Sequence, residues 1–163
     1  MRAGYTTSIP NGANGGTAGN NSGSTASDTT FYDTGSGGTN LTITAKGGAG
    51  GGSMAAGTTV VRATPGAGGG AGSTSGSDAA WSTGMVGSYG GAGLRFSATI
   101  CISGDGGGAT RSWGSDARAV NGSTVGESAQ WACAGGSGGA ANSTTDRAGG
   151  AGSPGLIIVT EYK

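Results

Sequence analysis

The chain has 163 residues, of which 41 are glycine and three are proline, and its eight basic residues are balanced by eight acidic ones. The large aliphatic and Phe side chains comprise three Leu, six Ile, six Val and two Phe, 17 in all, which is too few for an ordinary hydrophobic core. Zero net charge does not fit the composition of disordered chains and argues against a nucleic-acid partner. The absence of histidine excludes Ser-His-Asp and Cys-His catalysis within the chain.

The first residues, Met1-Arg2-Ala3-Gly4-Tyr5, contain no apolar run, so we expect no signal peptide, and no apolar stretch is long enough to span a membrane. Glycine clusters then recur at irregular separations, without the regular period of a solenoid or of collagen. They cover residues 11–23, 35–38, 47–52, 66–72, 87–93, 104–108, 135–139 and 149–155.

Glycine lacks a Cβ, so glycine-rich backbones can pack closely and pair their polar groups laterally. We therefore predict a single domain, residues 1–163, with an irregular, all-β-like fold. Its core is a bundle of packed polyglycine II helices, which resemble polyproline II, with a few short β-strands and little or no α-helix. The alternating residues 41–44 and 96–102 predict strands, and the apolar run Leu156-Ile157-Ile158-Val159 predicts a buried final strand over 156–162. Segments 77–86 and 109–120 are predicted to be loops.

The sequence offers little for metal or catalytic chemistry. Cys101 and Cys133 leave a disulfide open, but two buried free thiols are favoured, and no metal-ligand spacing occurs. Asp28 with Asp33, and Asp105 with Asp116, are interpreted as turn or cap carboxylates. Gly150, Gly152 and Gly155 match GxGxxG by spacing but precede a predicted strand, so no dinucleotide site is expected. The prediction is of a protein that is not an enzyme, with no cofactor and no metal.

Three stretches carry a resemblance to a known family. The first is Leu41-Thr42-Ile43-Thr44-Ala45-Lys46-Gly47-Gly48-Ala49-Gly50-Gly51-Gly52, and the second is Ile102-Ser103-Gly104-Asp105-Gly106-Gly107-Gly108-Ala109. The third is Gly149-Gly150-Ala151-Gly152-Ser153-Pro154-Gly155-Leu156-Ile157-Ile158-Val159-Thr160-Glu161-Tyr162. From about residue 11 onward the chain resembles the glycine-rich C-terminal domain of bacteriophage tail-fibre proteins, including the tip adhesins of T-even-like phages. One departure is that only about ten residues precede the first glycine block, which leaves the mode of attachment to a fibre open. The resemblance implies a bundle of polyglycine-type helices whose intervening loops contact the host surface.

The segments between glycine clusters hold the candidate contact residues. Trp81 and Trp113 have small, polar neighbours and are interpreted as exposed receptor contacts, together with Arg111 and Arg118. Phe31 and Tyr32 are similar but weaker candidates for receptor contact. Tyr89 is a weaker candidate, and Trp131, beside Ala132 and Cys133, is interpreted as core. If the segments run up and down and residues 96–102 reverse at one end, Trp81 and Trp113 emerge at the same end of the bundle.

Several functions are weighed against one another. The leading prediction is a receptor-binding tip or tail-fibre end domain of a phage virion. Its partners would be a bacterial outer-membrane protein or surface glycan and other virion subunits, with a homo-oligomer left open. The alternative is a purely structural decoration or fibre subunit without receptor contact. A more remote alternative is an ice-binding protein, which needs a flat face of evenly spaced small residues, and a glycine-rich wall or silk protein is less favoured.

Overall fold

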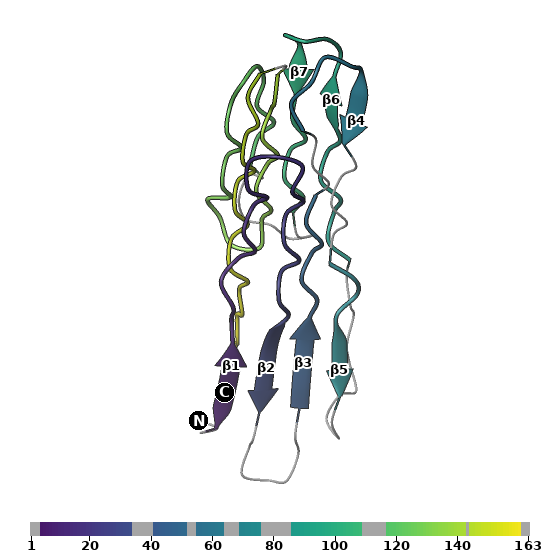
Figure 1. Cartoon of the computed structure of the whole chain (residues 1–163). Coiled ribbons are helices and arrows are strands. Elements are labelled where there is room, and N and C mark those ends of the chain that lie inside the picture. Colours follow the sequence, from purple (N-terminus) through teal and green to yellow (C-terminus); the bar gives the residue numbers. More distant parts are fainter. Residues whose placement is uncertain are drawn as a thin grey trace.

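The computed structural model describes residues 4–33, 41–51, 55–63, 69–75, 86–108, 117–142 and 144–160. The described chain is an elongated bundle of extended segments that run up and down its long axis, with a small β-sheet towards each end (Figure 1). None of these residues forms a helix, so this part of the chain contains no helix that could cross a membrane. The predicted all-β-like class, with much irregular structure, is therefore confirmed.

A four-stranded antiparallel sheet lies at the end that carries both termini (Figure 1). Its strands are β1 (Tyr5–Ser8), β2 (Thr29–Asp33), β3 (Leu41–Ala45) and β5 (Ser73–Ser75), in the order β1-β2-β3-β5. The strand predicted over residues 41–44 is thus confirmed as β3. Phe31 in β2 is buried, and its ring lies 5.3 Å from that of Tyr5 in β1, so this pair anchors one face of the sheet.

A three-stranded antiparallel sheet occupies the opposite end, formed by β4 (Val61–Ala63), β6 (Gly93–Arg95) and β7 (Cys101–Ile102). The strand predicted over residues 96–102 is wrong for its first five residues, which form the turn between β6 and β7. The Ser97 hydroxyl accepts hydrogen bonds from the amides of Thr99 and Ile100, and the Phe96 amide donates to the Ile100 carbonyl. Such local serine bonds compete with a strand ladder and favour a turn.

Between the sheets, glycine-rich segments are joined by lateral backbone hydrogen bonds that recur every three residues. Segment 103–108 illustrates this pattern, because successive residues are bonded to three different neighbours in turn. Segment 117–120 is bonded first: the Ser103 amide donates to the Val120 carbonyl, and three residues later the Gly106 amide donates to the Ala117 carbonyl. Segment 135–138 is bonded through the carbonyls of Gly104 and Gly107, which accept from the amides of Gly138 and Gly135 respectively. Segment 88–91 is bonded through the carbonyls of Asp105 and Gly108, which accept from the amides of Gly91 and Ser88 respectively. Each of the three neighbouring segments is therefore reached by every third residue.

Segment 148–153 repeats the arrangement with a different set of neighbours. The amides of Gly149 and Gly152 donate to the carbonyls of Gly16 and Ala13 respectively, in segment 13–16. The amides of Gly150 and Ser153 donate to the carbonyls of Ser137 and Ala134, in segment 134–137. The carbonyls of Ala148 and Ala151 accept from the amides of Gly126 and Ala129, in segment 126–129. These bonds again connect one segment to three others. The interior is thus held together largely by main-chain groups, which satisfies the requirement that buried amides and carbonyls be paired.

Serine side chains extend this lateral bonding. Ser137 is 2% exposed, and its hydroxyl accepts the Glu127 amide at 2.8 Å. Ser103 is likewise buried, and its hydroxyl accepts the Val120 amide at 2.8 Å. In both cases a side-chain oxygen takes the place of a carbonyl, so a small hydroxyl residue can replace glycine without leaving a neighbouring amide unpaired.

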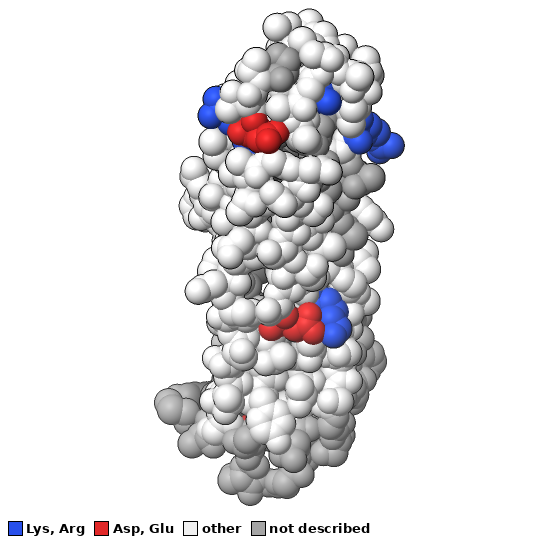
Figure 2. Space-filling model, in the orientation of Figure 1, with Lys and Arg blue, Asp and Glu red and all other residues white. Residues whose placement is uncertain are grey.

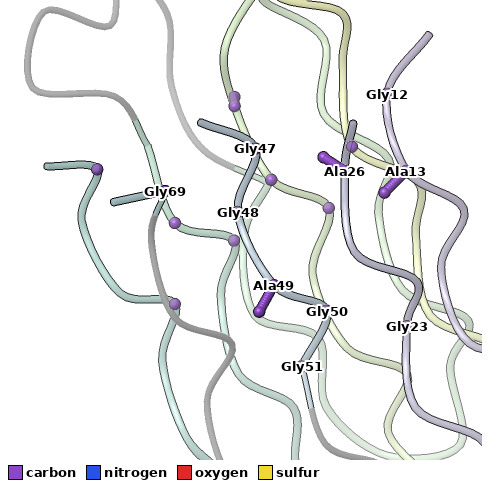
Figure 3. A pocket seen from close by; sticks show the side chains of 18 of the residues that line it. Gly12, Ala13, Gly23, Ala26, Gly47, Gly48, Ala49, Gly50, Gly51 and Gly69 are labelled. Atoms are coloured by element: carbon purple, nitrogen blue, oxygen red, sulfur yellow. The ribbon is translucent and has the colours of Figure 1, made fainter. Parts of the chain in front are cut away.

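The interior of the described chain contains few large side chains. Its most buried residues include Ala140 and Ala141, together with Ser137, whereas large aliphatic side chains such as Val60 and Ile158 are exposed. A cavity of about 610 Å³ between the segments is lined mainly by glycine, alanine and serine. Figure 3 shows the backbone of residues 47–51 running past Gly23, with the short side chains of Ala26 and Ala49 beside it. Packing therefore depends on close approach of backbones.

The final strand predicted over residues 156–162 is not present in its described part. Residues 156–160 form no strand, and Leu156, Ile158 and Val159 are 50%, 69% and 49% exposed. Within the described chain no backbone hydrogen bond joins these residues to a neighbour. An apolar run without a paired neighbour does not form a ladder, which explains the failure of the prediction. Residues 161–162 lie outside the described residues.

Candidate functional site

Most of the two tryptophan-bearing segments predicted to contact a receptor, residues 77–85 and 109–116, lies outside the described residues, and so do Trp81, Trp113 and Arg111 themselves. One described flank of the first segment, however, is adjacent to one described flank of the second. Gly108, which precedes residues 109–116, accepts the Ser88 amide at 2.8 Å and donates its own amide to the Ser88 hydroxyl at 2.8 Å. Ser88 follows residues 76–85 by three positions. Both segments are therefore attached to neighbouring parts of the bundle.

The turn between β6 and β7 explains this adjacency. Leu94 pairs with Ile102 and Arg95 with Cys101, so the chain reverses at one end and returns alongside itself. The reversal that the sequence prediction required over residues 96–102 is confirmed. Residues 86–92 and 103–108 consequently run antiparallel, and the Gly91 amide donates to the Asp105 carbonyl. Val86 and Gly108 lie at the ends of these segments that are remote from the turn.

Trp131 lies close to the same attachment points, contrary to its interpretation as a core residue. Its side chain is 54% exposed. The turn that carries it ends at Ala134, which forms a bridge with Gly108, while the Gly135 amide donates to the Gly107 carbonyl. Cys133 closes the turn in a left-handed conformation with φ of 65°, and its amide donates to the Pro154 carbonyl. Trp131 is therefore an exposed tryptophan beside the attachment points of the two other tryptophan-bearing segments.

Two further exposed residues border this surface. Tyr89, beside the Ser88 attachment, is 72% exposed, which agrees with its selection as a weaker candidate. Arg118 lies in the described part of the second tryptophan-bearing segment, two positions after residue 116. It is exposed, and it donates its amide to the Glu127 carboxylate at 3.3 Å. The neighbouring Ala117 carbonyl accepts the Gly106 amide, which holds this position against segment 103–108. Arg118 is therefore an exposed residue beside segment 103–108.

Phe31 and Tyr32 do not belong to this arrangement. Both lie in β2 rather than in a loop, and the burial of Phe31 against Tyr5 corrects its prediction as a receptor contact. Tyr32 is half-buried and points to the opposite face of the sheet, because successive residues of a strand alternate. The sequence offered a signal for this outcome, since Thr29-Thr30-Phe31-Tyr32 is rich in β-formers.

The Asp28 carboxylate is held by two structural partners. The Asp28 carboxylate accepts a hydrogen bond from the Lys46 ammonium at 2.7 Å and another from the Gly47 amide at 3.1 Å. The bond from Lys46 lowers the pKa of this carboxyl below its ordinary value of 3.8, and the bond from Gly47 has the next largest effect. Cys101 and Cys133 are free thiols, the first buried and the second half-buried. Among the described residues no group of three or more His, Cys, Asp or Glu could hold a metal ion.

Comparison with known proteins returns no family model, no curated protein and no solved structure that matches this chain.

Proposed function

We propose that the glycine-rich segments form a bundle of polyglycine II-type helices. The support is the three-residue spacing of the lateral hydrogen bonds along segments 103–108 and 148–153. A polyglycine II helix has three residues per turn and presents every third residue to the same neighbour. A β-strand instead presents every second residue to one side, so its ladder would repeat with a different period.

This bundle serves, in our proposal, as the receptor-binding tip or fibre-end domain of a bacteriophage virion. The observation that carries the proposal is the adjacency of the attachment points of three tryptophan-bearing connections, at Ser88, Gly108 and Ala134. A rigid scaffold whose backbones are closely bonded can hold variable connections in place. Tryptophan and arginine are typical anchors of binding interfaces, because they bury a large area for few frozen torsions. The sequence resemblance to tail-fibre tip domains supports the same assignment.

The partners of such a domain are a bacterial outer-membrane protein or surface glycan on one side and other virion subunits on the other. The exposed aliphatic side chains of Leu156, Ile158 and Val159 favour an assembly contact, because clustered exposed apolar groups mark protein interfaces. The same observation supports a second candidate function, a structural fibre or decoration subunit without receptor contact.

Cell binding by tryptophan variants tests the proposal and separates these two functions. We would replace Trp81, Trp113 and Trp131 singly by alanine and measure adhesion to intact bacteria beside thermal stability. Truncating an interface anchor typically costs about 2 kcal/mol or more, roughly thirtyfold in affinity. We expect at least one variant to remain folded and to lose adhesion on this scale.

The matched control is Phe96→Ala. Phe96 is 56% exposed and lies in the β6–β7 turn, at the end of its segment remote from the tryptophan connections. This variant should bind cells as the parent does. If the parent binds no bacteria, or if all three folded tryptophan variants bind as the parent does, the receptor-binding assignment at this surface is wrong and the structural function is favoured.

A further inference from the structure

One face of the four-stranded sheet carries a complete array of hydroxyl groups. Strand register places residues of all four strands opposite one another in two rows. The first row is Thr6, Tyr32, Thr42 and Ser75. The second row is Ser8, Thr30, Thr44 and Ser73. Every position of both rows is therefore occupied by a threonine, serine or tyrosine. We refer to these eight residues as the hydroxyl face.

The opposite face of the same strands is different in character. It carries Phe31 and Asp33, which are buried, and the aliphatic Ile43. No member of the hydroxyl face is buried, and the members on the outer strands β1 and β5 are exposed. Within the part of the chain that the structure describes, none of the eight hydroxyl groups has a hydrogen-bond partner. These groups are therefore free to bind a ligand.

The geometry of the array is regular. Adjacent strands lie about 4.8 Å apart, so each row spans roughly 14 Å, and the two rows are separated by about 7 Å along the strands. The next pair along the same face, Asp28 and Lys46, forms an ion pair, which neutralises the border of the array. Figure 2 shows an acidic and a basic cluster side by side in the lower half of the molecule, and the described part of the surface below them is almost without charge.

We propose that the hydroxyl face binds a neutral polysaccharide chain. Hydroxyl groups both donate and accept hydrogen bonds, which matches a ligand that is itself built of hydroxyl groups. The half-exposed ring of Tyr32, in the middle of one row, offers an apolar surface on which the C–H face of a sugar ring can lie. An acidic polymer would require cations, and the only described cation beside the array, Lys46, is already paired with Asp28.

A flat ice surface fits this face less well. An ice lattice requires a uniform plane of small side chains, and the phenol of Tyr32 interrupts the plane between Thr6 and Thr42. The inference rests on the proposed function in one respect, since it takes the polysaccharide to be one that a bacterial surface displays. It assigns the contact to a surface other than the tryptophan connections.

The test compares isosteric variants on the two faces of the same sheet. Thr30→Val with Thr44→Val removes two central hydroxyls while it keeps the shape and β-propensity of the side chains. Thr7→Val with Thr74→Val makes the same chemical change on the opposite face of β1 and β5. Binding of the full chain to soluble dextran, mannan and galactan would be measured by affinity electrophoresis and calorimetry, with polygalacturonate as the acidic comparison.

We expect the parent to bind at least one of the neutral polysaccharides and polygalacturonate more weakly. The Thr30/Thr44 variant should bind about tenfold more weakly at an unchanged melting temperature, whereas the Thr7/Thr74 variant should bind as the parent does. Equal binding by both variants, or no binding by the parent to any neutral polysaccharide, overturns the inference. Thermal hysteresis that the Thr30/Thr44 change abolishes, without polysaccharide binding, overturns it in favour of ice.

Cell adhesion distinguishes this inference from the proposed function. A parent that adheres to bacteria but binds none of the polysaccharides leaves the virion function standing and removes the glycan site. A parent that binds polysaccharide but adheres to no bacterium retains the hydroxyl face as a glycan site and removes the receptor-binding function.

Discussion

The carbonyl group of Gly23 occupies the position at which a Cβ on residue 50 would lie. The same relationship recurs between Gly69 and the Lys46 carbonyl, whereas Gly70, the next residue in the chain, has nothing within 4 Å of its own Cβ position. Glycine is therefore required at some positions of a cluster by the approach of a neighbouring backbone. At others it is dispensable.

Substitution of Gly69 and Gly70 by alanine tests this difference within one segment. Gly69→Ala forces the Lys46 backbone away and should destabilise the fold by about 1–3 kcal/mol, the usual cost of overpacking. Gly70→Ala should change the free energy of unfolding by less than about 0.5 kcal/mol. Gly50→Val should lower the free energy of unfolding by about 3 kcal/mol or more, because the valine side chain would collide with the Gly23 backbone. Thermal and denaturant unfolding measure all three, and equal stabilities for the Gly69 and Gly70 variants would contradict close backbone packing.

Ser137→Ala should destabilise the chain although it removes a single oxygen atom. The Ser137 side chain is buried and its hydroxyl is the acceptor for the Glu127 amide, so its loss removes a part-buried hydrogen bond at a cost of about 0.5–1.5 kcal/mol. Ser22→Ala is the control, because Ser22 is exposed. Amide hydrogen exchange at residue 127 should accelerate in the Ser137 variant alone. An unchanged exchange rate would show that this hydroxyl does not stabilise the contact.

Arg95 should matter more to stability than Arg62 in the adjacent strand. Arg95 is 4% exposed, and its guanidinium donates to the carbonyls of Thr59 at 2.9 Å and Ala55 at 2.6 Å. Arg95→Ala leaves these carbonyls without their charged donor and should cost about 1.5–3 kcal/mol. Arg62 is exposed, so Arg62→Ala should be nearly neutral. Urea unfolding compares the two, and a greater loss for the Arg62 variant would refute the role of Arg95.

Asp28 should titrate below its ordinary pKa of 3.8, because Lys46 and the Gly47 amide stabilise its charged form. A lowered pKa in the folded state means that the carboxylate contributes stability above the unfolded pKa and loses it as the pH falls through the folded value. The stability difference between the parent and Asp28→Asn should thus be constant above about pH 5 and disappear in acid. NMR titration of the carboxyl carbon measures the midpoint, which Lys46→Gln should raise. A midpoint at or above 3.8 in the parent would be inconsistent with the ion pair.

The general character of the fold could be predicted from composition, since few apolar residues and many glycines leave close backbone packing as the source of order. The strand at Leu41–Ala45 could be predicted because it alternates clearly. The strand expected at 96–100 could not be distinguished from a turn, because the deciding interactions are the bonds of the Ser97 hydroxyl to nearby amides. The final apolar run resembled a buried strand, but strand formation depends on a partner that sequence alone does not reveal.

Side-chain burial was the least predictable property. Trp131 was assigned to the core because Ala132 and Cys133 follow it, yet in this fold the core positions are filled by residues as small as Ala140 and Ser137. A tryptophan is too large for the space between closely packed backbones, so a large side chain is placed outside. Many large apolar side chains of the described residues are therefore exposed, whereas Phe31, which lies in a sheet, is buried.

The three-residue repeat of lateral bonds has a consequence for changes in chain length. Inserting or deleting three residues within segment 148–153 moves it by one repeat and returns each amide to the same neighbour. Inserting one or two residues instead turns the backbone amides of this segment away from the carbonyls to which they donate. It also moves residues with side chains into the positions of Gly149 and Gly152, which are bonded to Gly16 and Ala13 of the neighbouring segment. Glycine-rich segments of this kind can thus lengthen or shorten only in phase, whereas the connections between them can change by any number of residues.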